Sequence, residues 1–150
     1  MSDYDFEHVT TDAAVTTYDT VKGVFEALLK EVRELSKKKP DATLSGSKVK
    51  LINKVLEDLL TILGEEPEGK YLEPLEDEQL PQVSDALMMM VQFEAALNAF
   101  HGRYYEYVEH RYFSSDWEWV TEENVETWKQ DHADMLERIA AEEDEEEEYE

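Results

Sequence analysis

The chain has 150 residues, with 38 Asp and Glu against 14 Lys and Arg, and therefore a formal net charge of −24. One domain is the default at this length, and 41% apolar residues are enough for one core, which argues against disorder of the whole chain. Five Gly and four Pro favour long helices over a turn-rich β fold, and the absence of Cys excludes disulfides and thiol nucleophiles.

The first expected elements are an acidic arm and a long helix. Residues 1–10 carry three acids and no base, so we expect a flexible acidic arm there, followed by a helical-bundle domain over 11–141. The first helix should run from about Thr11 to Lys39, with Asp12 as its N-cap and Pro40 as its stop. Its apolar residues alternate spacings of three and four, at Tyr18, Val21, Phe25, Leu28, Val32 and Leu35.

A second helix is expected after the connector 40–46, with Ser45 or Ser47 as its cap and Gly64 at its end. Its core face would consist of Ile52, Val55, Leu56, Leu59, Ile62 and Leu63. Residues 65–82 contain seven acids and three prolines, which predicts a long acidic surface loop. A connection of this length is unusual in a small bundle, and we expect Tyr71, Leu72 and Leu75 to turn inward from it.

Two further helices complete the chain. The third, capped by Ser84, is expected to reach Phe113, with a seam that includes Met90, Phe93, Leu97 and Phe100. Residues 117–120 would form a short aromatic connector, and Thr121 would cap the fourth helix. Its seam is Val125, Trp128, His132, Met135, Leu136 and Ile139. Residues 142–150 are nearly all acidic, and carboxylates are unfavourable at a helix C-terminus, so we expect a disordered acidic tail.

Four amphipathic helices joined by short or moderate links predict an all-α fold. The expected architecture is an antiparallel four-helix bundle with a long acidic loop between helices two and three and a disordered acidic C-terminal tail. The first and third helices would be much longer than the other two. Loop residues or a second copy of the chain must cover the excess, so a homodimer is one of the oligomeric states left open.

The charge is unevenly distributed and indicates the type of partner. Residues 101–150 hold eighteen acids and four bases, whereas residues 21–60 hold nine bases and six acids. An anionic field of this kind attracts basic proteins and disfavours nucleic acid as a direct ligand. We therefore expect a non-enzymatic acidic protein-binding module that docks on a basic protein surface. Carboxylates four residues apart on a helix rise ~6 Å, comparable to phosphate spacing, so mimicry of nucleic acid or inhibition of a nucleic-acid-binding protein is one form of this function.

Two tryptophans mark the candidate contact site. Trp117 and Trp119 lie on one side of the chain if the connector is extended, with Glu118 opposite. Tryptophans among carboxylates resemble a protein-binding hot spot, although rings that plug the end of the bundle would show the same pattern. The expected partner-binding residues are Trp117, Glu118, Trp119, Glu122, Glu123 and Glu126.

Arg103 and His110 offer a catalytic alternative. Six residues separate them, so they would lie two turns apart on one face of the third helix. The pair resembles the Arg-x4–6-His element of the HEPN superfamily, helical-bundle ribonucleases and their inactive relatives. The resemblance implies metal-independent RNA cleavage at a dimer cleft, with His as acid or base and Arg stabilising the phosphorane charge. The other interpretation is a surface ion pair of Arg103 with Glu106 or Glu109, and whether the chain is an enzyme stays open.

No metal, cofactor or membrane contact is expected. No His has Glu three residues before it, as a di-iron bundle would need, and Glu94, Asn98 and His101 supply too few ligands for a closed site. The Lys37–Lys39 cluster, with three more lysines up to Lys54, either binds an anion or neutralises helix ends and the acidic loop. No apolar run approaches the ~20 residues of a membrane span and the N-terminus does not resemble a signal peptide, which predicts a cytoplasmic protein.

Overall fold

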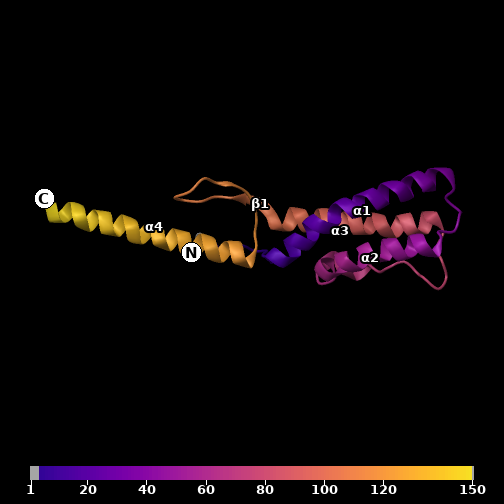
Figure 1. Cartoon of the computed structure of the whole chain (residues 1–150). Coiled ribbons are helices and arrows are strands. Elements are labelled where there is room, and N and C mark those ends of the chain that lie inside the picture. The colour runs from indigo at the N-terminus through magenta and orange to yellow at the C-terminus, as the bar shows by residue number, and fades with distance from the viewer. Residues whose placement is uncertain (1–3, 150) are drawn as a thin grey trace. The chain divides into compact units, whose positions relative to one another are not determined.

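A computed structural model describes residues 4–149 (Figure 1). Contacts divide them into two compact units, which we call the helical unit (residues 13–102) and the hairpin unit (residues 4–12 with 103–149). The elements are α1 (Asp12–Lys38), α2 (Gly46–Leu63), the 3-10 helix η1 (Pro67–Tyr71), α3 (Val83–Tyr104), β1 (Tyr105–Val108), β2 (Asp116–Trp119) and α4 (Glu122–Tyr149). The chain is mostly helical, but a two-stranded sheet occupies residues that the sequence assigned to the end of the third helix and to the connector after it.

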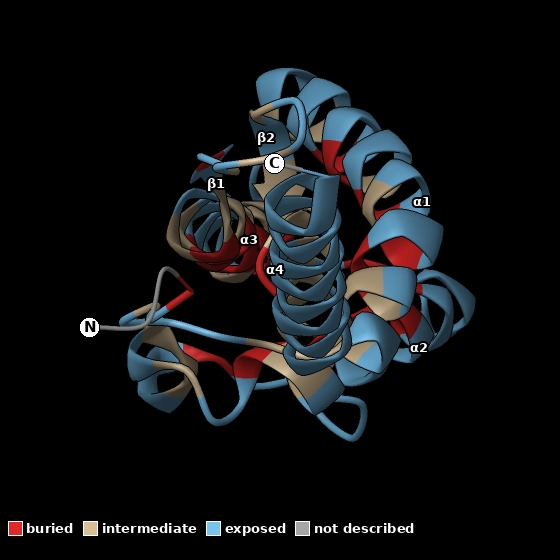
Figure 2. Cartoon of the chain, turned by 90° about the vertical axis from the view of Figure 1, so that its left-hand side faces the viewer, coloured by how far each residue is buried: buried red, intermediate tan, exposed pale blue. Residues whose placement is uncertain are grey.

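The helical unit contains α1, α2, η1 and most of α3. The core of the unit lies where these helices face one another (Figure 2). Its largest fully buried side chains are Phe25, Leu29, Val49, Leu56, Leu59, Leu63, Met90, Phe93 and Phe100. The predicted stripe of α1 is confirmed at Tyr18, Val21, Phe25 and Val32, whereas Leu28 and Leu35 are only half-buried.

The long helices α2 and α3 begin at the same end of the helical unit. The backbone N–H of Leu44, two residues before α2, donates to the carbonyl oxygen of Pro81 at 3.0 Å, and the N–H of Val83 donates to that of Ala42 at 2.8 Å. The connector after α1 therefore touches the start of α3. It follows that α2 and α3 point the same way and α1 points the opposite way, which differs from the antiparallel order expected from the sequence.

This arrangement explains the unusual length of the connection between α2 and α3. Because both helices start at one end, the chain must return along α2 before α3 begins. The Asn53 amide holds the returning segment: its Nδ2 donates to the Leu75 carbonyl at 2.9 Å and its Oδ1 accepts from the Leu75 N–H at 2.8 Å. Leu72 and Leu75 are buried as expected, but Tyr71 is 62% exposed, so its predicted inward position is wrong.

A β-hairpin begins where the sequence predicted the C-terminal part of the third helix. Helix α3 ends at Tyr104 and not at Phe113, and β1 and β2 then pair antiparallel. The physical reason is the alternation of aromatic residues in Tyr-Glu-Tyr-Val and Asp-Trp-Glu-Trp, which suits a half-exposed pleated strand better than a helix. The expected aromatic connector over 117–120 is therefore mostly a strand.

The N-terminal arm packs into the hairpin unit over residues 4–10. Tyr4 is buried in a small core with Val108 and Val120, and Phe6 and Trp128 pack against it. The N–H of Thr10 donates to the Val120 carbonyl at 3.0 Å. The segment 4–10 is therefore ordered and not the flexible arm expected from the sequence, because Tyr4 and Phe6 pack against apolar residues of the hairpin unit. Residues 1–3 of the expected arm lie outside the described residues.

Helix α4 belongs to the hairpin unit, so the predicted four-helix bundle and its 11–141 boundaries are not confirmed. The hydroxyl of Thr121 accepts from the Asn124 N–H at 3.0 Å, which confirms the predicted cap. The helix continues to Tyr149 through most of the stretch expected to be disordered, because Glu has a high helix propensity even in an acidic run. Within residues 4–149, no helix combines the length and apolar character that a membrane span requires.

Candidate functional site

Four aromatic side chains share one face of the hairpin. The strand register pairs Tyr105 with Trp119 and Tyr107 with Trp117. Side chains alternate between the two faces of a strand, and directly paired residues project from the same face. The four rings therefore form one surface, which we call the aromatic face.

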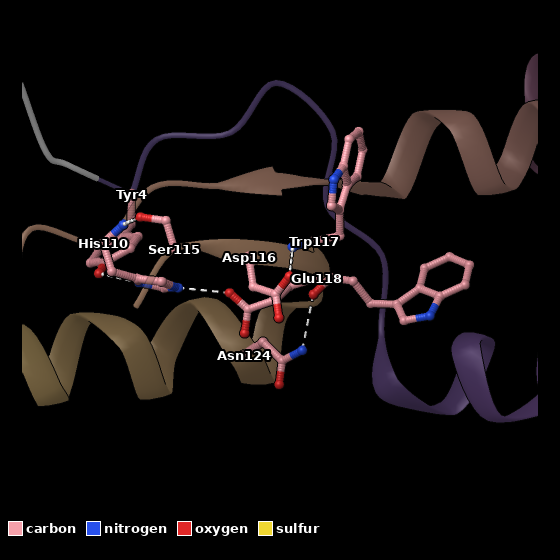
Figure 3. Close-up of polar contacts among 8 residues, drawn as sticks. Tyr4, His110, Ser115, Asp116, Trp117, Glu118 and Asn124 are labelled. Atoms are coloured by element: carbon pink, nitrogen blue, oxygen red, sulfur yellow. Dashed lines mark hydrogen bonds and ion pairs between the residues drawn. The ribbon is translucent and has the colours of Figure 1, made fainter. Parts of the chain in front are cut away.

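The rings of the aromatic face contact one another. Tyr105 stacks on Trp117 with ring centroids 6.0 Å apart, and its centroid lies 5.4 Å from that of Trp119. Tyr107 meets Trp117 edge to face at 6.0 Å. Trp117 is 56% exposed and Tyr107 is 51% exposed, and Trp117 points away from α4 (Figure 3). Large rings gathered in solvent contact are a feature of surfaces that bind another molecule.

The opposite face of the hairpin carries a buried hydrogen-bond chain centred on His110 (Figure 3). Its Nδ1 lies 2.8 Å from the Tyr4 hydroxyl and its Nε2 lies 2.7 Å from Glu118 Oε2. The His110 backbone N–H also donates to Ser115 Oγ at 2.9 Å. The His110 side chain is 5% exposed and that of Glu118 is 33% exposed, so this chain of bonds runs from the interior of the hairpin unit to its surface. Glu118, expected at the partner surface, is turned toward His110.

Arg103 and His110 do not share a helix face. Arg103 lies in the last turn of α3, whereas His110 follows β1, so a strand separates the two residues. Both ring nitrogens of His110 are already engaged by Tyr4 and Glu118. The helical placement on which the ribonuclease resemblance depended is therefore wrong.

Glu122 and Glu126 line a shallow groove at the start of α4. Val9 of the N-terminal arm and Val125 of α4 form its apolar part, and Lys129 and Gln130 complete its lining. Glu122 and Glu126 are one helical turn apart and both are exposed. We call this feature the acidic groove. Glu123 has another role, because its Oε2 accepts the Asp12 N–H at 2.8 Å and so ties the arm to the first turn of α4.

The hairpin unit carries most of the charge. Counted along the sequence, residues 1–12 and 103–150 hold 22 Asp and Glu against 4 Lys and Arg, a net charge of −18. Residues 13–102 hold 16 acids against 10 bases, a net charge of −6. The aromatic face and the acidic groove thus belong to the strongly anionic part of the molecule.

The residues considered for a metal serve packing in the helical unit. Glu94 Oε1 accepts from Arg33 Nη2 at 2.9 Å, and His101 stacks on Tyr18 with centroids 6.1 Å apart. Both contacts join α3 to α1. Among residues 4–149, no group of three or more His, Asp or Glu is arranged to hold a metal ion.

Tyr105 and Tyr107 are site residues that the sequence interpretation missed. A signal was present, because Tyr-x-Tyr over 105–107 has the same period as Trp-x-Trp over 117–119. Reading both stretches as strands would have placed the four rings together. The chain matches no protein-family model, no curated protein and no solved structure, so its function is argued from these residues alone.

Proposed function

We propose that this chain is a non-enzymatic protein-binding module whose hairpin unit docks on a basic protein surface. The observation that carries the proposal is the exposed aromatic face on a unit of net charge −18. Tryptophan and tyrosine dominate the binding energy of protein interfaces. Their rings also attract the cationic side chains of Arg and Lys, most strongly where water is excluded.

The proposed mechanism has two steps. First, the anionic field of the hairpin unit steers a cationic partner and raises its association rate. Second, the aromatic face desolvates against the partner, with the exposed ring of Trp117 as the central anchor. Glu122 and Glu126 in the acidic groove supply charge at the rim. Glu118 and Glu123 instead bond to residues of their own unit: Glu118 contacts His110, and the exposed Glu123 accepts from the Asp12 N–H.

Mimicry of nucleic acid is a narrower form of the same proposal. Helix α4 has 28 residues, none of them buried, and so presents carboxylates along ~42 Å. Pairs such as Glu122 with Glu126 repeat at ~6 Å, comparable to the spacing of phosphates. A partner recognised in this way would use its own nucleic-acid groove, so an oligonucleotide should compete for it. The proposal requires no cofactor, and it includes the cytoplasmic location predicted from the sequence, with which the absence of Cys is compatible.

The test is capture of partners from an extract of the native host, followed by elution in a salt series. We expect basic proteins that leave the column between about 0.15 and 0.5 M salt, because the Debye length falls below ~8 Å in that range. A Trp117→Ala column should retain far less, whereas a Phe113→Ala column, which loses an exposed aromatic ring of the same hairpin, should behave like wild type. The proposal would be contradicted if the retained proteins stayed bound at high salt and bound equally well to the Trp117→Ala column.

A further inference from the structure

The helical unit has an apolar groove between α1 and α2. Its volume is about 190 Å³, and it is lined by Leu28, Val32, Leu35, Leu44, Leu51 and Ile52. Glu31 and Lys48 are its only polar lining residues. A cavity of ~150 Å³ holds a benzene molecule, so this groove has room for one or two aliphatic side chains. Leu51 at its edge is 51% exposed.

An apolar stripe of matching size lies on the second half of α4. Met135, Leu136 and Ile139 are spaced by one helical turn or less, none of them is buried, and Leu136 is 46% exposed. Seven consecutive acids, residues 142–148, follow this stripe on the same helix. The stripe is the continuation of the seam that the sequence assigned to a fourth bundle helix.

The groove and the stripe have complementary charge. Lysines gather where α1 ends and α2 begins, and residues 21–60 carry nine bases against six acids. Lys38, Lys39 and Lys48 are exposed at this end. The N-terminus of α2 also lies there, and the positive end of its helix dipole favours carboxylates. The acidic run of α4 would therefore be stabilised beside this end of the groove.

We propose that the groove between α1 and α2 receives the Leu136–Ile139 stripe of α4 from a second copy of the chain. The acidic run 142–148 would then lie beside the lysines, so α4 of the second copy would run parallel to α1. Charge favours α4 as the occupant of the groove. Residues 21–60 form a net positive stretch in a chain of net charge −24, and α4 is the most acidic helix of that chain. The inference does not depend on the aromatic face, although its acidic run belongs to the row of α4 carboxylates that the mimicry proposal also uses.

Salt should distinguish this contact from binding of a basic partner. Two copies of net charge −24 repel one another at long range, but at about 0.15 M salt the Debye length is only ~8 Å. Screening therefore removes most of the repulsion while the closer contacts in the groove persist. Self-association should strengthen between about 0.01 and 0.15 M salt, whereas partner binding should only weaken.

Cross-linking tests the contact directly, because the chain has no Cys. Two single variants, Leu51→Cys and Ile139→Cys, are given tags of different mass, mixed and oxidised. We expect the mixed disulfide dimer to form at least about tenfold faster than in a control mixture of Met88→Cys and Ile139→Cys, since Met88 is more exposed than Leu51 but lies on α3. Equal rates in the two mixtures would overturn the proposal.

The double variant Leu51→Cys with Ile139→Cys tests whether the groove is filled by α4 of a second copy or by α4 of the same molecule. Disulfides that link different molecules support the proposal, and disulfides formed only within a monomer overturn it. Sedimentation of the Cys-free chain gives a second measurement. Its average mass should rise with concentration, and Leu51→Glu should weaken the association by at least about tenfold, an effect that Met88→Glu should not reproduce. A wild-type chain that stays monomeric at about 100 μM and 0.15 M salt would also overturn the inference.

Discussion

Trp117 stacks on Tyr105 across the hairpin, with ring centroids 6.0 Å apart and ring planes inclined by 28°. The two residues are diagonal neighbours in the strand register, because Tyr105 pairs directly with Trp119. Tyr105 thereby supports an indole that is more than half exposed. An exposed ring held in one orientation loses little conformational freedom on binding, which is a property expected of an interface anchor.

Replacing Trp117 should weaken partner binding more than it affects folding. We expect Trp117→Ala to raise the Kd by about 30-fold, the effect of losing a hot-spot residue of ~2 kcal/mol. The loss of ring contacts should lower the free energy of unfolding by only about 0.5–1.5 kcal/mol. Titration calorimetry and urea denaturation measure the two effects. Phe113→Ala is the matched control, and an equal loss of affinity in that variant would remove the special role of Trp117.

Reversing the charge of the acidic groove should act on the association rate. In the variant Glu122→Lys with Glu126→Lys, we expect association to slow by about tenfold and dissociation to change by less than about threefold, because rim charges act through steering. Surface plasmon resonance at low salt measures both rates. The control is Glu73→Lys with Glu76→Lys, which makes the same change of net charge at two exposed residues of the helical unit. If both variants slow association equally, net charge alone sets the association rate and the acidic groove makes no specific contribution.

Removing the His110 side chain should destabilise the hairpin unit. In His110→Ala the Tyr4 hydroxyl and the Glu118 carboxylate both lose a buried partner, so we expect a loss of about 1–3 kcal/mol in the free energy of unfolding. Glu109→Ala, an exposed neighbour, should cost less than about 0.5 kcal/mol. Intrinsic tryptophan fluorescence reports the transition, because all three tryptophans belong to the hairpin unit and the Trp128 ring centroid lies 5.4 Å from that of His110. RNA cleavage by wild type that disappears in stably folded His110→Ala would instead restore the catalytic interpretation.

Two glycines should respond in opposite ways to alanine. A Cβ at Gly69 in η1 would clash with the carbonyl oxygens of Leu63 and Gly64, so Gly69→Ala must shift the backbone, and we expect a loss of at least about 1 kcal/mol in the free energy of unfolding. At Gly23, within α1, a Cβ would meet nothing within 4 Å. Gly23→Ala should therefore stabilise the chain by about 0.5–1 kcal/mol through the higher helix propensity of alanine. Thermal unfolding compares the stability of the two variants. Unchanged stability of Gly69→Ala would show that the backbone around η1 shifts at little cost in free energy.

The candidate site was predictable only in part. The exposed tryptophan and the carboxylates Glu122 and Glu126 followed from residue type and position, because acids near a helix start stay in solvent. Glu118 and Glu123 look the same in the sequence, yet each is engaged by a partner from a distant segment. Glu118 meets His110, and Glu123 meets the backbone of Asp12, 111 residues away in the chain. Residue type does not distinguish a carboxylate with such a partner from one without.

Residue type and spacing predict the helices α1 and α2, the start of α4, the buried stripe of α1, the caps Ser45 and Thr121, and the acidic excess. These depend on spacing and on contacts within a few residues. Contacts between distant segments decided the parallel order of α2 and α3 and the place of the N-terminal arm, whereas the end of α3 at Tyr104 had a local signal in the alternation of Tyr105 and Tyr107. The deciding contacts are Leu44 with Pro81 and Tyr4 with His110, the latter pair 106 residues apart. Local periodicity carries no information about contacts at that separation, because they form only when distant segments compete for the same apolar surface.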